Sequence, residues 1–170
     1  MDVAALLTDA IDRIRSSLRD AVEGLEAEAL AFRPDDEANP IGWLAWHTAR
    51  IQDDHVAALA SHEQLYVTHG WAERLGMPAD ESDIGYGHDR DDVAAHVPQD
   101  ATTLLAYLDA VCDRTKAFLD TLTPDDLDRV VDESWDPPVT AGVRLVSVVN
   151  DNLQHTGQAA YVRGLWERRG

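Results

Sequence analysis

Apolar residues recur every three or four positions through four long segments of this sequence, and that spacing constrains the fold more than any other feature. In the first segment the stripe consists of Val3, Leu6, Leu7, Ile11, Ile14, Leu18, Val22 and Leu25. Such spacing places apolar side chains on one face of an α-helix. Similar stripes run through residues 40–60, 102–122 and 140–166, and no segment shows convincing strand alternation. The sequence therefore predicts an all-α protein.

The connections between these segments predict how the helices are joined. Asn39 and Pro40 are typical of a helix start. Residues 62–100 are interrupted by glycine and proline and hold four of the seven histidines, with one short helical turn expected at residues 71–75. We expect a crossover here that partly covers one end of the bundle. Four amphipathic helices with one long crossover indicate a four-helix bundle, and we expect residues 1–170 to form one domain.

Charge and cysteine content restrict the partners and the compartment. The formal net charge of −18 would repel a phosphate backbone, which disfavours nucleic-acid binding. No apolar run approaches the roughly 18 residues that a membrane span needs, and the acidic first segment is unlike a secretory signal. Cys112 is the single cysteine, which fits a reducing, cytoplasmic location. Abundant Ala, Asp and Arg beside a single lysine suggest a high-G+C source, such as an actinobacterium or a halophile.

Two polar features interrupt the apolar faces and are candidates for a metal site. His47 stands among apolar positions of the second helix, and Asp151 and His155 are four residues apart on the inner face of the fourth. Each has an ordinary alternative: a hydrogen-bonded core histidine, and a surface Asp–His pair. A metal ion would satisfy all three polar groups together. Two imidazoles and one carboxylate leave coordination positions open, as catalytic sites do.

Two segments resemble the signature segments of the DinB-like superfamily. These are residues 39–47 (NPIGWLAWH) and 150–158 (NDNLQHTGQ). The group includes YfiT-like metal hydrolases and mycothiol-dependent enzymes such as the maleylpyruvate isomerase type. The resemblance implies a four-helix bundle with an up-up-down-down order of helix directions. It also implies His47 and His155 as metal ligands, with Asp151 at a position where many members have histidine.

The resemblance further implies a divalent-metal-dependent S-transferase. Such an enzyme joins a low-molecular-weight thiol, here mycothiol, to an electrophile in a detoxification reaction. The expected metal is Zn²⁺, and the same ligands suit Ni²⁺, Fe²⁺ or Mn²⁺. The expected partners are a small thiol and a small electrophile, without nucleic acid or membrane, and a homodimer is one expected assembly. Two alternatives remain open: a metal-dependent hydrolase that cleaves an amide such as a thiol conjugate, and a non-catalytic metal- or thiol-binding stress protein.

Other reactive side chains are weaker candidates. Cys112 lies among apolar residues of the third helix and is expected to be a core residue. His55 lies two helical turns beyond His47, too far along the axis to share one ion easily. The histidines of the crossover lack tight ligand spacing, so we expect them to be solvated loop residues. We also expect aromatic residues such as Trp46, Trp71, Trp135 and Tyr161, together with Arg163, as possible pocket residues.

Overall fold

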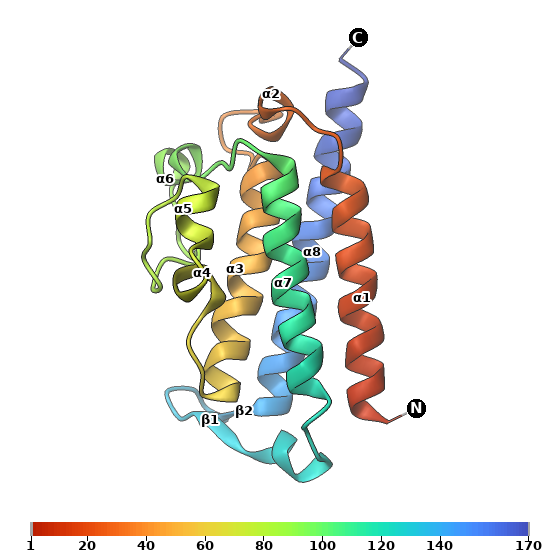
Figure 1. The fold of residues 1–170 in the computed structure, drawn as a ribbon, viewed down its shortest axis with the longest axis vertical. Coiled ribbons are helices and arrows are strands. Elements are labelled where there is room, and N and C mark those ends of the chain that lie inside the picture. Colours follow the sequence, from red (N-terminus) through yellow and green to blue (C-terminus); the bar gives the residue numbers. More distant parts are fainter. Residues whose placement is uncertain (1, 170) are drawn as a thin grey trace.

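Four long helices build the molecule in the computed structural model, which describes residues 2–169 (Figure 1). They are α1 (Val3–Val22), α3 (Ile41–Ala60), α7 (Ala101–Leu119) and α8 (Ala141–Glu167). The shorter elements are α2 (Ala27–Leu30), α4 (Leu65–Thr68), α5 (Trp71–Leu75), α6 (Arg90–Ala95), the 3-10 helix η1 (Pro124–Asp128), β1 (Val130–Asp132) and β2 (Val139–Thr140). The expected all-α bundle is confirmed, with one addition: β1 and β2 form a small antiparallel hairpin.

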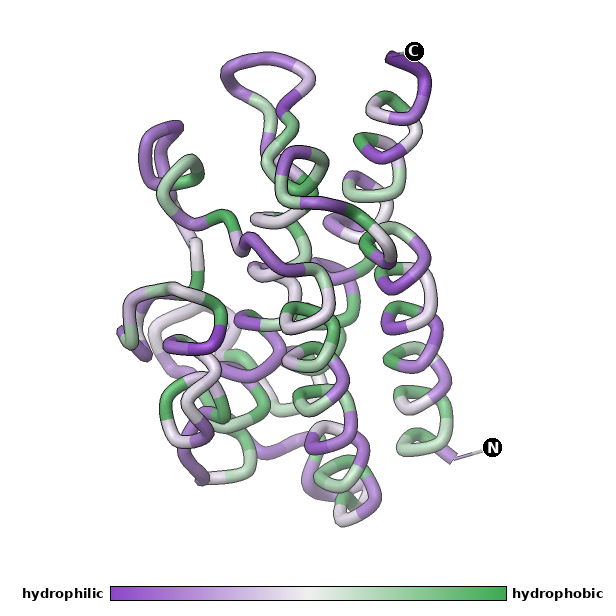
Figure 2. Tube along the Cα trace, turned by 45° about the horizontal axis from the view of Figure 1, so that its top comes forward, coloured by the Kyte–Doolittle hydropathy of each residue, from purple (hydrophilic) through white to green (hydrophobic). Residues whose placement is uncertain are grey.

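The starts of the long helices follow from local capping. Asp2, Asp100 and Thr140 each accept a hydrogen bond from a backbone N–H of the first turn that follows. The start of α3 lies one residue later than expected, because Pro40 is the N-cap and the helix begins at Ile41. In Figure 2 apolar and polar residues alternate turn by turn along α1, as the amphipathic stripe predicts.

The order of helix directions differs from the expected one. Arg15 of α1 pairs with Asp109 of α7 at 2.7 Å near the middle of both helices, and Arg163 near the end of α8 donates to the carbonyl of Glu23 at the end of α1. The directions are up for α1, down for α3 and α7, and up for α8 (Figure 1). The cause lies in the connections: α2 and its short flanking loops reverse the chain after α1, whereas the crossover carries it back along the bundle.

The crossover, residues 61–100, lies along the flank of α3 rather than over an end of the bundle (Figure 1). The expected helical turn at residues 71–75 is confirmed as α5. With the crossover on one side and three long helices around it, α3 is the central helix, and every residue from Ile41 to Asp53 is buried. Polar side chains in this stretch of α3 are therefore held inside the protein. Among the described residues no helix is long and apolar enough to cross a membrane.

Candidate metal centre

The three side chains singled out in the sequence meet between α3 and α8. His47 Nε2 lies 3.7 Å from Asp151 Oδ2, and His155 Nε2 lies 3.6 Å from Asp151 Oδ1. One ligand atom from each residue lies within 4.8 Å of the others. Helices α3 and α8 are antiparallel. His47, the seventh residue of α3, therefore lies beside the middle of α8, where Asp151 and His155 are found. We call His47, Asp151 and His155 the bundle cluster.

Outer hydrogen bonds determine which nitrogen of each imidazole faces the cluster. His47 Nδ1 lies 2.5 Å from the carbonyl oxygen of Ile84, and His155 Nδ1 lies 2.8 Å from Gln158 Oε1. Both oxygens accept, so both Nδ1 atoms carry the proton. In the neutral imidazoles the two Nε2 atoms then have free lone pairs directed toward Asp151. Outer acceptors of this kind orient histidine ligands in metal sites.

Burial and neighbouring charges tune the three groups. Desolvation, helped by the nearby His155, lowers the pKa of His47 to about 4, so this imidazole is neutral at physiological pH. Burial acts to raise the pKa of Asp151, but its interaction with His155 outweighs burial and lowers it. Burial acts to lower the pKa of His155, yet the interactions with Asp151 and Gln158 raise it. The cluster therefore offers a carboxylate and at least one neutral imidazole.

The spacing and the unmet hydrogen-bonding capacity fit a divalent cation. The separations of 3.6 and 3.7 Å are too long for hydrogen bonds. They are close to the roughly 3.4 Å between two ligands that each lie about 2.0–2.2 Å from a tetrahedral ion. Asp151 Oδ2 is buried and accepts no hydrogen bond from residues 2–169. The Asp151 side chain is nevertheless 36% exposed, which leaves the cluster open to a small molecule.

A close approach of the crossover covers the inner side of His47. The ring of Trp43 stacks on His47 with centroids 4.7 Å apart and planes 9° apart. On the crossover, Gly85 has a φ of +84°, and a Cβ built there would lie 2.8 Å from His47 Nδ1. Only glycine allows the backbone to pass this close and present the Ile84 carbonyl to the imidazole. The spacing of histidines in the sequence gives no sign of this contact.

Comparison with known proteins agrees with this geometry. The family model of the DinB superfamily matches residues 10–159. The chain belongs to the DinB superfamily. A crystal structure of a conserved protein from Enterococcus faecalis is similar to it, with 32% identity, a TM-score of 0.89 and coverage of 97% of each chain. No curated protein matches the chain. Because the DinB superfamily includes metal-dependent enzymes, membership favours a metal role for the bundle cluster without naming a reaction.

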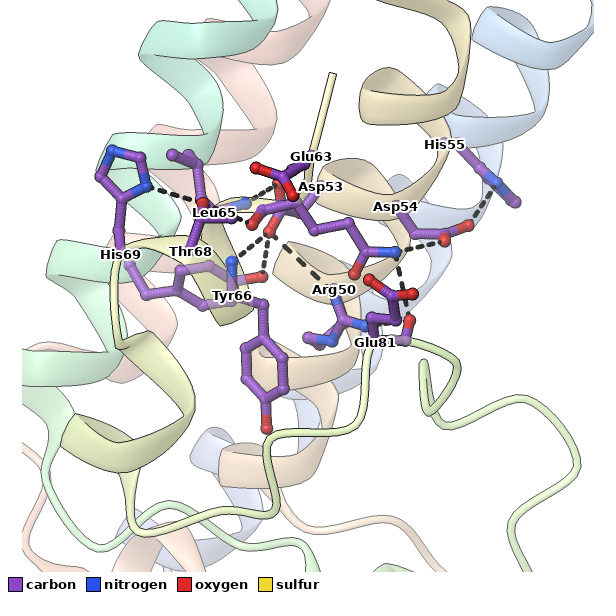
Figure 3. Close-up of polar contacts among 12 residues, drawn as sticks. Arg50, Asp53, Asp54, His55, Glu63, Leu65, Tyr66, Thr68, His69 and Glu81 are labelled. Carbon is purple, nitrogen blue, oxygen red and sulfur yellow. Dashed lines mark hydrogen bonds and ion pairs between the residues drawn. The ribbon is translucent and has the colours of Figure 1, made fainter. Parts of the chain in front are cut away.

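Two buried charges of α3 hold the crossover in this DinB-superfamily chain (Figure 3). Arg50, whose side chain is fully buried, donates to the backbone carbonyls of Glu81 and Asp83. Asp53, 3.9 Å from Arg50, accepts hydrogen bonds from the first two backbone N–H groups of α4. Buried charges need such partners. Together they tie both ends of residues 65–83 to α3, and the next residue carries the carbonyl that faces His47.

A second group of two histidines and one aspartate lies within the crossover. We call Asp83, His88 and His96 the crossover cluster. His88 Nε2 and His96 Nε2 each lie 2.9 Å from a different oxygen of Asp83. The expectation of solvated loop histidines is wrong for these two, because Asp83 draws both imidazoles into a half-buried position beside Trp46. Since ligand spacing in a loop depends on how the loop folds, the sequence could not show this grouping.

The remaining candidates lie away from the bundle cluster. Cys112 is buried, and desolvation raises the pKa of its thiol to about 12, which confirms it as a core residue. His55 pairs with Asp54 at 3.0 Å, outside the cluster. Trp135 and Tyr161 are exposed. His62, Trp46, Trp71 and Arg163 likewise take no part in the cluster.

Proposed function

We propose that this protein is a divalent-metal-dependent enzyme that joins a low-molecular-weight thiol to an electrophile. The observation that carries the proposal is the bundle cluster, in which one ligand atom from each of two imidazoles and a carboxylate lies within 4.8 Å of the others, and Asp151 Oδ2 has no hydrogen-bond partner among the described residues. Zn²⁺ suits this donor set, and Ni²⁺, Fe²⁺ and Mn²⁺ are compatible with it. The assignment to thiol chemistry, with mycothiol as the first thiol to test, is supported by the sequence resemblance to mycothiol-dependent members of the superfamily.

The residues of the chain have separate tasks in this proposal. A divalent ion held by the cluster would lower the pKa of a bound thiol, so that thiolate is available near neutral pH. His47 is kept neutral by burial and is aimed by the Ile84 carbonyl. Asp151 supplies one negative charge. Trp43 covers one face of the His47 ring, and Asp151 is the most exposed side chain of the three.

A thiol panel tests the proposal. Untagged protein loaded with Zn²⁺ is incubated with monochlorobimane and, in parallel, mycothiol, bacillithiol, glutathione or coenzyme A. We expect one thiol to be consumed for each bimane conjugate formed, and we expect the rate to fall to background in His155→Ala. His69→Ala is the control, because His69 is exposed and far from the cluster in the chain. A zinc-loaded protein that turns over none of the four thiols would contradict the proposal.

A hydrolase is distinguished in the same assay. If the protein cleaves the amide of a preformed bimane–thiol conjugate without added thiol, the bundle cluster serves hydrolysis, and the transferase proposal is wrong. A protein that binds metal and does neither is a binding protein.

A further inference from the structure

Helices α3 and α8 continue side by side beyond the bundle cluster toward the β1–β2 hairpin (Figure 1). On α3, His55 follows His47 by eight residues, and on α8, Arg144 precedes Asp151 by seven. At a rise of about 1.5 Å per residue, both displacements correspond to roughly 10–12 Å along the helices. Because the two helices are antiparallel, both displacements run in the same direction. His55 and Arg144 therefore lie at the same level, roughly 10–12 Å along the helices from the cluster.

A cavity of about 400 Å³ lies at this position. It is lined by His55, Ala58, Leu59, Arg129, Val130, Val131 and Arg144. Three of these side chains are basic, the rest are apolar, and no carboxylate contributes to the lining. Apolar walls strengthen the attraction between an anion and the basic groups, because they lower the local dielectric constant. A pocket with this lining is suited to a carboxylate or phosphate group.

The charge of Arg129 is the least compensated of the three. Its Nη2 donates to the backbone carbonyl of Leu59 at 2.9 Å, and among residues 2–169 it forms no salt bridge within 4.0 Å, although its charge acts on the more distant Asp126. Arg144 pairs with Asp132 at 3.1 Å, and His55 pairs with Asp54. The carbonyl of Leu59 therefore orients the Arg129 guanidinium without neutralising it.

The composition of the whole chain makes this pocket unusual. The protein has 32 acidic and 14 basic residues, so most of its surface is expected to be negatively charged. A cavity lined by two arginines and a histidine, without a carboxylate, differs from that average. Since Arg144 and His55 are paired with carboxylates, the charge available to an anion in this pocket is that of Arg129.

We propose that this pocket binds the carboxylate or phosphate group of a substrate whose reactive end lies at the bundle cluster. The substrate is then an elongated anion, with about 10 Å between its charged group and its reacting atom. This assignment of substrate class rests on the proposed function, whereas anion binding by the pocket does not. The anionic group belongs either to the thiol or to the electrophile.

Binding of inorganic phosphate and of succinate tests the pocket independently of catalysis. The probes are titrated into metal-free protein, and binding is followed by NMR shifts of the arginine Nε–H groups. We expect Arg129→Gln to weaken binding about tenfold, since a charge-assisted hydrogen bond is lost. The matched control is Arg114→Gln, because Arg114 also donates at 2.9 Å to one backbone carbonyl, that of Glu63, outside this pocket; it should bind the probes normally.

Two further variants keep the test decisive if Arg129→Gln does not fold. Arg129→Lys retains the charge and should bind within about threefold of the parent, and Arg144→Gln should weaken binding. Equal affinity in the parent, Arg129→Gln and Arg144→Gln would overturn the proposal, as would shifts confined to other arginines.

Paired substrates then locate the anion. 8-Mercaptooctanoic acid is compared with its amide, and 6-maleimidohexanoic acid with its amide, using zinc-loaded protein, because the extended chain of each acid is long enough to reach from the pocket to the cluster. We expect KM for the charged member of one pair to rise about tenfold in Arg129→Gln, with KM for its neutral partner unchanged. An equal effect on charged and neutral members would contradict the substrate assignment. If no pair is turned over, the proposed function fails, and the phosphate titration still decides whether the pocket binds anions.

Discussion

The bundle cluster and the crossover cluster each consist of two histidines and one aspartate, yet their hydrogen bonds differ. In the bundle cluster each Nδ1–H donates outward, so both Nε2 atoms face the aspartate with free lone pairs. In the crossover cluster His88 Nδ1 accepts from Trp43 Nε1 at 3.2 Å, which places its proton on Nε2, toward Asp83. His96 Nδ1 lies 2.7 Å from the carbonyl oxygen of Asp92, and its Nε2 lies 2.9 Å from Asp83 Oδ2.

The comparison shows that outer hydrogen bonds, rather than side-chain composition, distinguish a metal site from a hydrogen-bonded clasp. In the bundle cluster the Nε2 lone pairs of both histidines are free for a cation, whereas in the crossover cluster the Nε2 of His88 carries a proton. Asp83 Oδ1 instead accepts hydrogen bonds from His88 Nε2 and from the backbone N–H of Gly85, which holds the loop that carries the Ile84 carbonyl. One cluster therefore supports the other.

The largest expected difference is in metal content. His155→Ala should lower the metal content of untagged protein from about one divalent ion per chain to background, because one of three ligands is lost. His96→Ala, an equivalent truncation in the crossover cluster, should retain about one ion per chain. Inductively coupled plasma mass spectrometry measures the metal content of both variants. Loss of the ion in His96→Ala alone would reverse our assignment of the two clusters.

Gly85→Ala should lower the metal affinity of the bundle cluster, because residue 85 follows the carbonyl that orients His47. The new Cβ would meet His47 Nδ1 and force the Ile84 carbonyl away, and the loss of such an outer contact typically costs about 10- to 100-fold in metal affinity. The matched control is Gly87→Ala, since Gly87 also has a positive φ, of +77°, but a Cβ there meets nothing within 4 Å. Competition titration with a zinc chelator measures both. Similar affinities in the two variants would show that the close approach has no effect on the site.

Asp83→Asn should have a smaller effect, on stability. The amide is similar in shape but loses the charge that holds His96, and we expect the free energy of unfolding to fall by about 1–3 kcal/mol. Asp80→Asn is the comparison, because Asp80 is exposed and its hydrogen bonds are made within the same loop, chiefly with Ser82. Urea denaturation at pH 7 gives both values. If Asp80→Asn is destabilised as much as Asp83→Asn, the clasp has no special role.

Cys112 should show the smallest effect. Its thiol is buried with a pKa of about 12, so iodoacetamide should leave native protein unlabelled between pH 7 and 9. Unfolding in urea should expose the thiol to rapid labelling. Labelling of the native protein together with loss of thiol transfer would make Cys112 a rival nucleophile.

The sequence predicted what depends on helix periodicity, and it missed what depends on the path of a loop. His47, Asp151 and His155 could be named because helical spacing places residues on faces, and the family motifs marked the same positions. The crossover cluster, the Ile84 carbonyl and the glycine at 85 join residues whose separations follow no period. The closest signal was a pair of glycines at 85 and 87, which indicates a turn without showing what it approaches.

The helix directions were also beyond the periodic pattern. An amphipathic stripe shows which face of a helix is buried, but the stripe does not depend on whether the helix runs up or down in the bundle. The order was set by the connections, since only α2 with its short loops separates α1 from α3 while the crossover spans the length of the bundle. Loop length alone could have favoured this order.

An anomalous difference map from a zinc-soaked crystal tests the central claim most directly, because both clusters are present in the same molecule. We predict one strong peak bounded by His47 Nε2, Asp151 and His155 Nε2, and no peak beside Asp83. A peak held by Asp83, His88 and His96, with none between α3 and α8, would contradict the account.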